Sequence, residues 1–431
     1  MYRKIIKFLK NWKDNPNRKP LILKGARQVG KTYSILEFGR EHYENVAYFN
    51  FERNEKLKEI FNENLSPSYL IPLLSHSSGQ TIIKEKTLIV FDEIQTCEKA
   101  LTSLKYFCEE AADYHIIVAG SLLGIAVNRQ EFSFPVGKVN MKTMYPMDME
   151  EFLIAMNQEK MVIRIRECFE TNSPMPSIMH DSALSYYRQY LVVGGMPECV
   201  RQFSETGDYI LVRDIQATIL ANYLDDMSKY NPQNEIKKTR LTYNSITAQL
   251  SKTNTRFQYK LIKKGGRAAD FENAIEWLEL SGIISQVYKA EHPLKPLDDN
   301  KDIDAFKIYI SDLGLLCAKK ELVVSDIIYM SDALLNFKGG LAENYVNVHL
   351  TINGYTTYYW ESNRGAEIDF LIQRDGEIIP IEVKSADNTQ AKSLKFYIEN
   401  YKPPYAIKLS TKNFGFADGK KIVPLYAVFC V

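Results

Sequence analysis

Short apolar runs alternate with longer amphipathic or polar stretches in the first part of the chain, and this pattern predicts an α/β domain. Four runs rich in branched and aromatic residues have the length of strands, at residues 21–23, 46–51, 87–91 and 116–119. The stretch from Lys31 to His42 has few helix breakers and predicts a helix. The run at 87–91 leads directly into two carboxylates, as a buried parallel strand that ends at a site does.

The pattern changes in the middle of the chain. Residues 158–230 are rich in helix-favouring sequence. Two further helices are expected at 236–250 and 271–280, followed by strands at 283–288 and 306–310 on either side of a polar loop that contains proline. Helices followed by a strand, a loop and a second strand predict a winged helix.

A hairpin is predicted near the C-terminal end. Asp375-Gly376 separates the apolar-rich runs 367–374 and 377–384, and Asp-Gly between two such runs favours a two-residue type I′ turn. This turn fixes the register and places Asp369 directly opposite Glu382. One face of the hairpin is then apolar, and the other carries acids together with Lys384.

Length and charge limit the class of protein. A chain of 431 residues is expected to form two to four domains. The 54 Lys and Arg residues against 53 Asp and Glu residues leave a net charge of +1, so nucleic-acid binding would need a local basic patch. Six scattered cysteines and the lack of a long apolar run predict a soluble, cytoplasmic protein that does not enter a membrane.

A phosphate-binding motif joins the first strand to the first long helix. The spacing G-x-x-x-x-G-K-[ST] is typical of P-loop nucleotidases, in which backbone N–H groups surround phosphate oxygens. Lys31 would reach the β- and γ-phosphates of ATP, and the Thr32 hydroxyl would hold Mg²⁺. The predicted nucleotide-binding residues of this loop are Gly25, Ala26, Arg27, Gln28, Val29, Gly30, Lys31 and Thr32.

The acids after the third apolar run fit the same chemistry. In a P-loop enzyme Asp92 would hold the Mg²⁺ shell, and Glu93 would orient or deprotonate the attacking water. Ser121, at the tip of the next strand, would sense the γ-phosphate, although a turn serine gives the same pattern.

These segments resemble a large prokaryotic family of AAA+-type ATPases with an uncharacterised C-terminal domain. The resemblance is carried by the phosphate loop and by the segments Asn50-Phe51-Glu52, Phe91-Asp92-Glu93-Ile94-Gln95, Ala119-Gly120-Ser121 and Gly194-Gly195-Met196-Pro197-Glu198. It implies an ATPase core. Many members have arginine where Lys138 stands, so Arg129 is the other candidate for an arginine finger.

The polar face of the predicted hairpin is a candidate metal site. Two carboxylates opposite each other repel unless a cation lies between them, and Mg²⁺ favours one or two carboxylates plus water. Asp369 and Glu382-Val383-Lys384 resemble the PD-(D/E)xK nuclease core, which implies a restriction-endonuclease-like fold with catalytic Asp369, Glu382 and Lys384. Glu343 resembles the additional metal-ligating acid of that core. A solvated hairpin face with a Glu367–Lys384 ion pair is the alternative.

Together these patterns predict four domains: a P-loop AAA+-type core at 1–157, a helical lid at 158–230, a winged-helix-like domain at 231–320 and a nuclease-like domain at 321–431. Lysines and arginines between Lys237 and Arg267 form a local basic surface, for DNA phosphates or for lid and subunit contacts. The predicted function is an ATP- and Mg²⁺-dependent protein that acts on DNA, and a homo-oligomer is compatible with it. A nucleotide-switched binding or signalling protein with an inactive nuclease-like module is the alternative.

Overall fold

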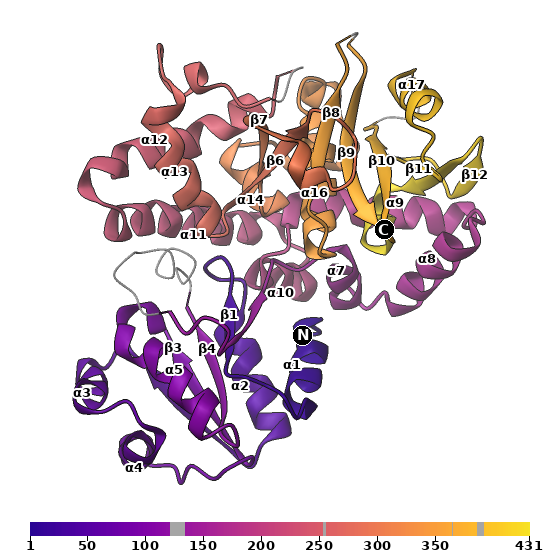
Figure 1. Cartoon of the computed structure of the whole chain (residues 1–431). Coiled ribbons are helices and arrows are strands. Elements are labelled where there is room, and N and C mark those ends of the chain that lie inside the picture. Colours follow the sequence, from indigo (N-terminus) through magenta and orange to yellow (C-terminus); the bar gives the residue numbers. More distant parts are fainter. Residues whose placement is uncertain (121–133, 253–255, 364, 386–391) are drawn as a thin grey trace. The chain divides into compact units, whose positions relative to one another are not determined.

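A computed structural model describes residues 1–120, 134–252, 256–363, 365–385 and 392–431 (Figure 1). It divides the chain into two compact units. We call residues 2–145 with 280–282 the N-terminal unit, and residues 146–279 with 283–431 the C-terminal unit.

The N-terminal unit is built on a five-stranded sheet in which every neighbouring pair is parallel. Its strand order is β2-β3-β4-β1-β5. Each of the four predicted runs is a strand, and a short fifth strand joins at the edge. The strands are β1 (Leu21–Lys24), β2 (Asn45–Asn50), β3 (Thr87–Asp92), β4 (His115–Ala119) and β5 (Asn140–Thr143).

Helices cover both faces of this sheet, which explains why β3 and β4 are apolar without alternation. α2 packs on one face, where Gly39 lies against Val46 and Leu88. The opposite face carries α3, α4 and α5. The helices of this unit are α1 (Ile5–Asp14), α2 (Lys31–His42), α3 (Glu55–Glu63), α4 (Pro67–Ser78) and α5 (Glu98–Glu110).

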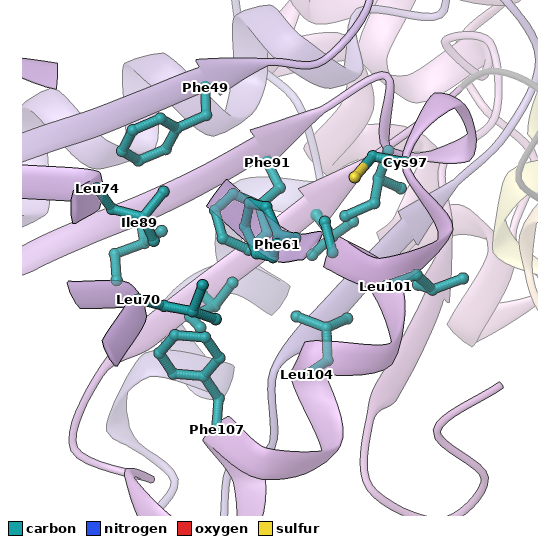
Figure 2. Packing of buried hydrophobic residues seen from close by; sticks show 14 of the residues in the cluster. Phe49, Phe61, Leu70, Leu74, Ile89, Phe91, Cys97, Leu101, Leu104 and Phe107 are labelled. Atoms are coloured by element: carbon teal, nitrogen blue, oxygen red, sulfur yellow. The ribbon is translucent and has the colours of Figure 1, made fainter. Parts of the chain in front are cut away.

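The core between the sheet and α3–α5 is rich in aromatic residues (Figure 2). Phe91 of β3 makes edge-to-face contacts with Phe49 of β2 and with Phe61 of α3, at centroid distances of 5.8 Å in both pairs. Leu70, Leu101 and the other labelled aliphatic residues surround these rings. This packing fixes β3, and with it the two acids at its end.

The C-terminal unit contains an eight-stranded mixed sheet with the order β12-β13-β11-β10-β9-β8-β6-β7. Its strands are β6 (Ile284–Ala290), β7 (Lys301–Ile310), β8 (Tyr358–Glu361), β9 (Glu367–Arg374), β10 (Glu377–Val383), β11 (Ala406–Ser410), β12 (Gly415–Ala417) and β13 (Lys420–Pro424). Neighbouring pairs are parallel for β6–β8, β10–β11 and β11–β13.

Helices make up most of the rest of this unit. They are α7 (Met149–Ala155), α8 (Glu159–Thr171), α9 (Ser177–Val193), α10 (Pro197–Thr206), α11 (Tyr209–Tyr230), α12 (Gln233–Gln249), α13 (Ala268–Leu280), α14 (Leu313–Lys319), α15 (Val324–Tyr329), α16 (Lys338–Ile352) and α17 (Lys392–Tyr401). Trp360 of β8 packs against Tyr397 of α17, so α17 covers one face of the sheet.

The prediction of a separate winged-helix domain at 231–320 needs correction. The expected strand pair is present as β6 and β7, but β6 also pairs in parallel with β8. Both strands therefore belong to the same sheet as the hairpin of the predicted nuclease-like domain. This pairing could not be read from the local pattern, because β7 and the three helices α14, α15 and α16 separate β6 from β8 in the chain.

The β9–β10 hairpin has the predicted register over most of its length. Asp375 and Gly376 have φ values of 51° and 77°, in the left-handed region that a type I′ turn requires. Residues 370–374 pair in order with residues 377–381, as predicted.

The regular pairing stops before it reaches the two acids. Asp369 and Phe370 of β9 lie opposite a single residue of β8, which is a β-bulge. Asp369 Oδ2 accepts a hydrogen bond of 2.7 Å from the Val383 N–H. The β9–β10 register thus ends at the pair of Phe370 and Ile381, one pair before the predicted pair of Asp369 and Glu382, and the Asp369 side chain contacts the backbone of β10.

Within the described residues, none of the helices has both the length and the apolar character needed to cross a membrane.

Candidate functional site

The phosphate loop runs from the end of β1 to the first residue of α2. Gly25 has a φ of 147°, and a Cβ at this position would lie 2.1 Å from the carbonyl oxygen of Met144, so only glycine fits. Gln28 and Gly30 also have positive φ values, of 65° and 90°. A loop curled in this way directly before a helix N-terminus is the geometry that binds phosphate groups.

Lys31 is buried within this loop. Its Nζ donates hydrogen bonds to the carbonyl oxygens of Gly25, at 2.8 Å, and of Ala26, at 2.7 Å. Burial lowers the pKa of Lys31 to about 8, although Glu93 and Asp92 act in the opposite direction. The ammonium group is therefore held in the loop close to both acids of the second motif.

Asp92 connects the second motif to the first. Its Oδ2 accepts hydrogen bonds from the Thr32 hydroxyl, at 3.0 Å, and from the Tyr48 hydroxyl, at 2.7 Å. Asn50 supports Tyr48 through a bond of 3.3 Å from its Nδ2. Tyr48 lies on β2 beside the end of β3, and sequence reasoning missed this partner because nothing in the local pattern marks it.

The backbone of Glu93 is strained, because its φ of 52° lies in the left-handed region that residues other than glycine rarely adopt. Gln95 Nε2 donates to Glu93 Oε2 at 2.5 Å, and the Thr96 hydroxyl donates to the Glu93 carbonyl at 2.9 Å. The residue is thus fixed at the end of β3 beside the loop. Lys31, Thr32, Asp92 and Glu93, which the sequence assigned to one site, lie together.

Arg3 also supports the loop, and the sequence reasoning did not single it out. Its guanidinium donates to the carbonyl oxygens of Val29, at 2.9 Å, and of Tyr145, at 2.7 Å. Arg3 is 6% exposed. A cation held against two carbonyls fixes the last turn of the loop before α2.

Two further predicted positions, Ser121 and Arg129, lie outside the described residues. Lys138, which stands where many members of the resembled family have arginine, forms an ion pair of 2.9 Å with Glu109. Both side chains are partly exposed, so this pair contributes little to stability.

The second set of predicted residues comes together in the C-terminal unit. α16 supplies Glu343, β9 supplies Asp369, and the end of β10 supplies Glu382 and Lys384. Burial raises the pKa of Asp369 well above its usual range, and the charges of Glu343 and Glu382 raise it further. Lys384 Nζ lies 2.5 Å from Glu382 Oε1. Lys384 is therefore paired with Glu382, and not with Glu367 as the alternative interpretation expected.

A buried lysine that the sequence reasoning missed lies among these acids. Lys307 of β7 is 1% exposed, and its Nζ lies 2.7 Å from Glu367 Oε1 and 3.4 Å from Glu343 Oε2. Burial works against its charge, but Glu343, Tyr309 and Glu367 together raise the pKa of Lys307 well above its ordinary value. The Tyr309 hydroxyl donates to Glu343 at 2.9 Å.

The fit of a metal ion to this cluster is partial. Across the described residues no group of three His, Cys, Asp or Glu side chains has an arrangement that could hold a metal ion. Lys307 already forms ion pairs with both Glu343 and Glu367. Glu382 Oε2, however, is buried and has no hydrogen-bond partner among the described residues. Glu382 and the neighbouring Asp369 are therefore the two carboxylates that remain for a cation. Mg²⁺ is commonly bound by one or two carboxylates together with water molecules.

The predicted basic surface is exposed along α12 and the loop that follows it. Lys238 forms an ion pair of 2.8 Å with Glu235, and Arg240 donates to the Ser228 hydroxyl at 2.5 Å. The exposed basic residues of this segment are Lys237, Arg240, Lys252, Lys260, Lys263, Lys264 and Arg267.

Comparison with known proteins identifies the type of the first domain. Residues 17–153 match a family model described as an AAA domain. Residues 184–325 and 338–428 match two families that are each described as a domain of unknown function, DUF8612 and DUF4143. No curated protein matches the chain. The chain therefore carries an AAA-type P-loop ATPase core, followed by regions whose families have no described activity.

Solved structures with similarity to the chain include a Walker-type ATPase of Pyrococcus abyssi, with 14% identity over 73% of this chain and 94% of that one, at a TM-score of 0.42. The Orc1 protein of Aeropyrum pernix in complex with DNA has 12% identity over 74% and 91%, at a TM-score of 0.30. Cdc6p of Pyrobaculum aerophilum has 13% identity over 76% and 92%, at a TM-score of 0.25.

Proposed function

We propose that the N-terminal unit binds ATP with Mg²⁺ at the phosphate loop and hydrolyses it. The observation that carries this proposal is the 3.0 Å hydrogen bond between Thr32 and Asp92, because it joins the two motifs at one point. The Thr32 hydroxyl and the Asp92 carboxylate are the groups that would hold Mg²⁺. The metal would neutralise charge on the β- and γ-phosphates when bound.

The roles of the other residues follow from their positions. Lys31 would exchange the carbonyls of Gly25 and Ala26 for phosphate oxygens, which are stronger partners for an ammonium group. Glu93 would accept a proton from the attacking water, and its bond from Gln95 would orient the carboxylate. Arg3 would keep the loop in its curled form.

Two substitutions test this assignment. Lys31→Ala should lose ATP binding, measured by calorimetric titration. Glu93→Gln should bind ATP but turn it over at least about 10²-fold more slowly, the usual contribution of a positioned base. Glu98→Gln is the matched control, because Glu98 is exposed at the start of α5, and it should keep normal turnover. Wild-type turnover in Glu93→Gln would remove Glu93 from the mechanism.

We propose as a second function that the C-terminal unit binds Mg²⁺ at Asp369 and Glu382 and cleaves phosphodiester bonds of DNA, with Lys384 positioning the water. The unpartnered Glu382 Oε2 and the raised pKa of Asp369 favour it, since both are relieved by a cation. Glu343 would join only by leaving Lys307. The alternative is a recognition module, in which Lys307 and Lys384 are the permanent counter-charges of the cluster.

The two alternatives differ in their response to metal. Mg²⁺ should raise the melting temperature of the wild-type protein, and Asp369→Asn should abolish this rise and any cleavage while leaving ATPase activity intact. Asp375→Asn is the matched control, because Asp375 is exposed and Asn-Gly also forms the type I′ turn. If Mg²⁺ neither stabilises the protein nor supports cutting of any DNA, the recognition module is correct.

The basic segment 237–267 would supply contacts to the phosphates of DNA. Its exposed side chains favour this proposal, and a lid or subunit contact is the competing use of the same surface.

A further inference from the structure

A cavity of about 760 Å³ lies in the C-terminal unit, beside the carboxyl ends of the parallel strands β10 and β11. Its wall is formed by residues 180–188 of α9, by Met330 and Lys338, by Ser385 and by the loop 411–413. The volume is in the range of pockets that hold a small molecule or a nucleotide. The crevice outside the carboxyl ends of parallel strands is also where α/β sheets bind ligands.

The wall of this cavity is held in place by hydrogen bonds. The ring nitrogens of His180 contact the Tyr426 hydroxyl, at 2.8 Å, and the Thr411 carbonyl, at 3.0 Å. The Asn413 side chain exchanges two hydrogen bonds with the backbone of Met175, at 2.9 and 2.7 Å. A pocket fixed in this way exists before a ligand enters, so binding costs little ordering of side chains.

The charged groups of the cavity are mostly cationic. Arg188, Lys338 and Lys412 line it against one acid, Asp181. Lys338 is engaged with the carbonyl of Met330, at 2.5 Å. Among the residues that the structure describes, Arg188 and Lys412 have no ion-pair partner. An excess of cations at a pocket attracts an anion.

The cavity also has apolar surface. Leu184 and Tyr187 are buried residues of α9 that form part of its lining, and Met330 adds a flexible apolar side chain. Cations beside an apolar wall suit a ligand that has a phosphate group and a flat, less polar body. A nucleotide has both parts.

Cationic residues lead from this cavity to the carboxylate cluster. Ser385 of the wall directly follows Lys384. Lys408 of β11 is the cross-strand neighbour of Glu382. Burial lowers the pKa of Lys408, and the next contribution comes from the charge of Lys412, so these two lysines lie close together. The carboxyl ends of β10 and β11 therefore carry both a part of the cavity wall and the lysines nearest to Glu382.

We propose that this cavity binds one nucleotide of a single nucleic-acid strand, with its phosphate on Arg188 and Lys412, and so presents the neighbouring phosphodiester to Glu382 and Lys384. This inference rests on the proposed second function and adds a strand-binding site to it. The strand, and not a free nucleotide, is the ligand because the cationic residues continue beyond the cavity to the cluster.

The test is the binding of fluorescein-labelled hexathymidylate to the full-length protein, followed by anisotropy in EDTA, so that neither metal nor cleavage contributes. Arg188→Glu and Lys412→Glu should each weaken binding at least about tenfold, because a lost phosphate contact becomes a repulsion. Lys160→Glu, the same charge change at an exposed residue of α8, should keep wild-type affinity. Circular dichroism of each variant should match the wild type, and Lys412→Gln should repeat the loss in milder form.

Both the substitutions and a competition experiment can contradict the proposal. Wild-type affinity in both Arg188→Glu and Lys412→Glu would overturn the proposal, even if the protein cuts DNA. Loss of affinity in both variants, without cleavage by any form of the protein, would reject the second function and keep the strand site. Thymidine 5′-monophosphate should displace the hexamer only at concentrations about 100-fold higher, because it makes fewer phosphate contacts. Displacement at equal concentration would overturn the assignment to a strand.

Discussion

Two buried cations, Arg3 and Lys307, hold other groups of the candidate sites in place. Arg3 reaches Val29 and Tyr145, and Lys307 reaches Glu367. Each of these contacts spans 26 or more residues. A lysine or arginine in an amphipathic stretch is normally solvated, and only the fold brings it to a buried acid or carbonyl. The residues of the phosphate loop could be predicted because their spacing itself creates the geometry.

His115, the first residue of β4, gives a prediction about pH. It is 4% exposed, and its Nδ1 lies 2.7 Å from the Tyr43 hydroxyl. Burial, together with the charges of Arg18 and Lys13, lowers the pKa of His115 to about 4. Between pH 6.5 and 4, His115 is therefore protonated in the unfolded chain but neutral in the folded unit. The free energy of unfolding falls as the solution is acidified through this range.

The expected contribution of His115 is a loss of about 2 kcal/mol in the free energy of unfolding between pH 7.5 and pH 5. Urea unfolding at the two pH values measures it. Acidification should lower the free energy of unfolding of His115→Gln by about 2 kcal/mol less than that of the wild type. The carboxylates contribute equally to both proteins, so the difference reports on His115. His76→Gln, at an exposed histidine of α4, should behave as the wild type. An identical pH dependence in His115→Gln would show that His115 is not the group responsible.

At the scale of elements, the hairpin shows how far local chemistry determines structure. The Asp375–Gly376 turn fixed the β9–β10 register as predicted, because a type I′ turn leaves one way to pair the strands. The bulge at Asp369 was not predictable in the same way. It arises between β9 and β8, and β8 carries no turn that relates it to the hairpin.

The segment from α12 to Arg267 gives the prediction at this scale. If its exposed cations bind DNA phosphates, log affinity should fall linearly with log salt, by about 0.9 for each contact. Changing Lys263, Lys264 and Arg267 to glutamate should flatten this slope by roughly two to three units. The measurement is the affinity for a labelled DNA duplex at several salt concentrations.

The matched control carries the same charge change on exposed lysines of the N-terminal unit, Lys7, Lys10 and Lys105. Its salt slope should equal that of the wild type. If the triple substitution in the basic segment also leaves the slope unchanged, the segment serves lid or subunit contacts.

At the scale of the whole molecule, the division into domains was the hardest property to predict. The ATPase core follows from two motifs at the ends of β1 and β3, which belong to one sheet with β4 between them. The predicted winged helix does not form a separate domain, because β6 and β7 complete a sheet whose other strands come later in the chain. Which strands pair depends on how their side chains pack against neighbouring strands and against the layer that covers them. The sequence pattern of a single strand does not contain this information.

Two compact units predict two separate responses to ligands. Scanning calorimetry should resolve two unfolding transitions, and a non-hydrolysable ATP analogue with Mg²⁺ should raise only one of them. The stabilisation should reach about 2.7 kcal/mol at a ligand concentration 100 times the dissociation constant. Lys31→Ala should abolish the shift, and Glu98→Gln should keep it. A single transition that moves as a whole would show that the two units unfold together.

The strand order of the eight-stranded sheet also has a consequence for biosynthesis. All five strands of the first sheet have left the ribosome once residue 143 has emerged, so this sheet can close early. The ribbon of β6 and β7 has no partner on its β6 edge until residues 358–361 are made, and β13 follows only at residues 420–424. At typical translation rates of about 5–20 residues per second, the newborn chain carries this open edge for several seconds. A chaperone that shields extended backbone would act on the chain in this interval.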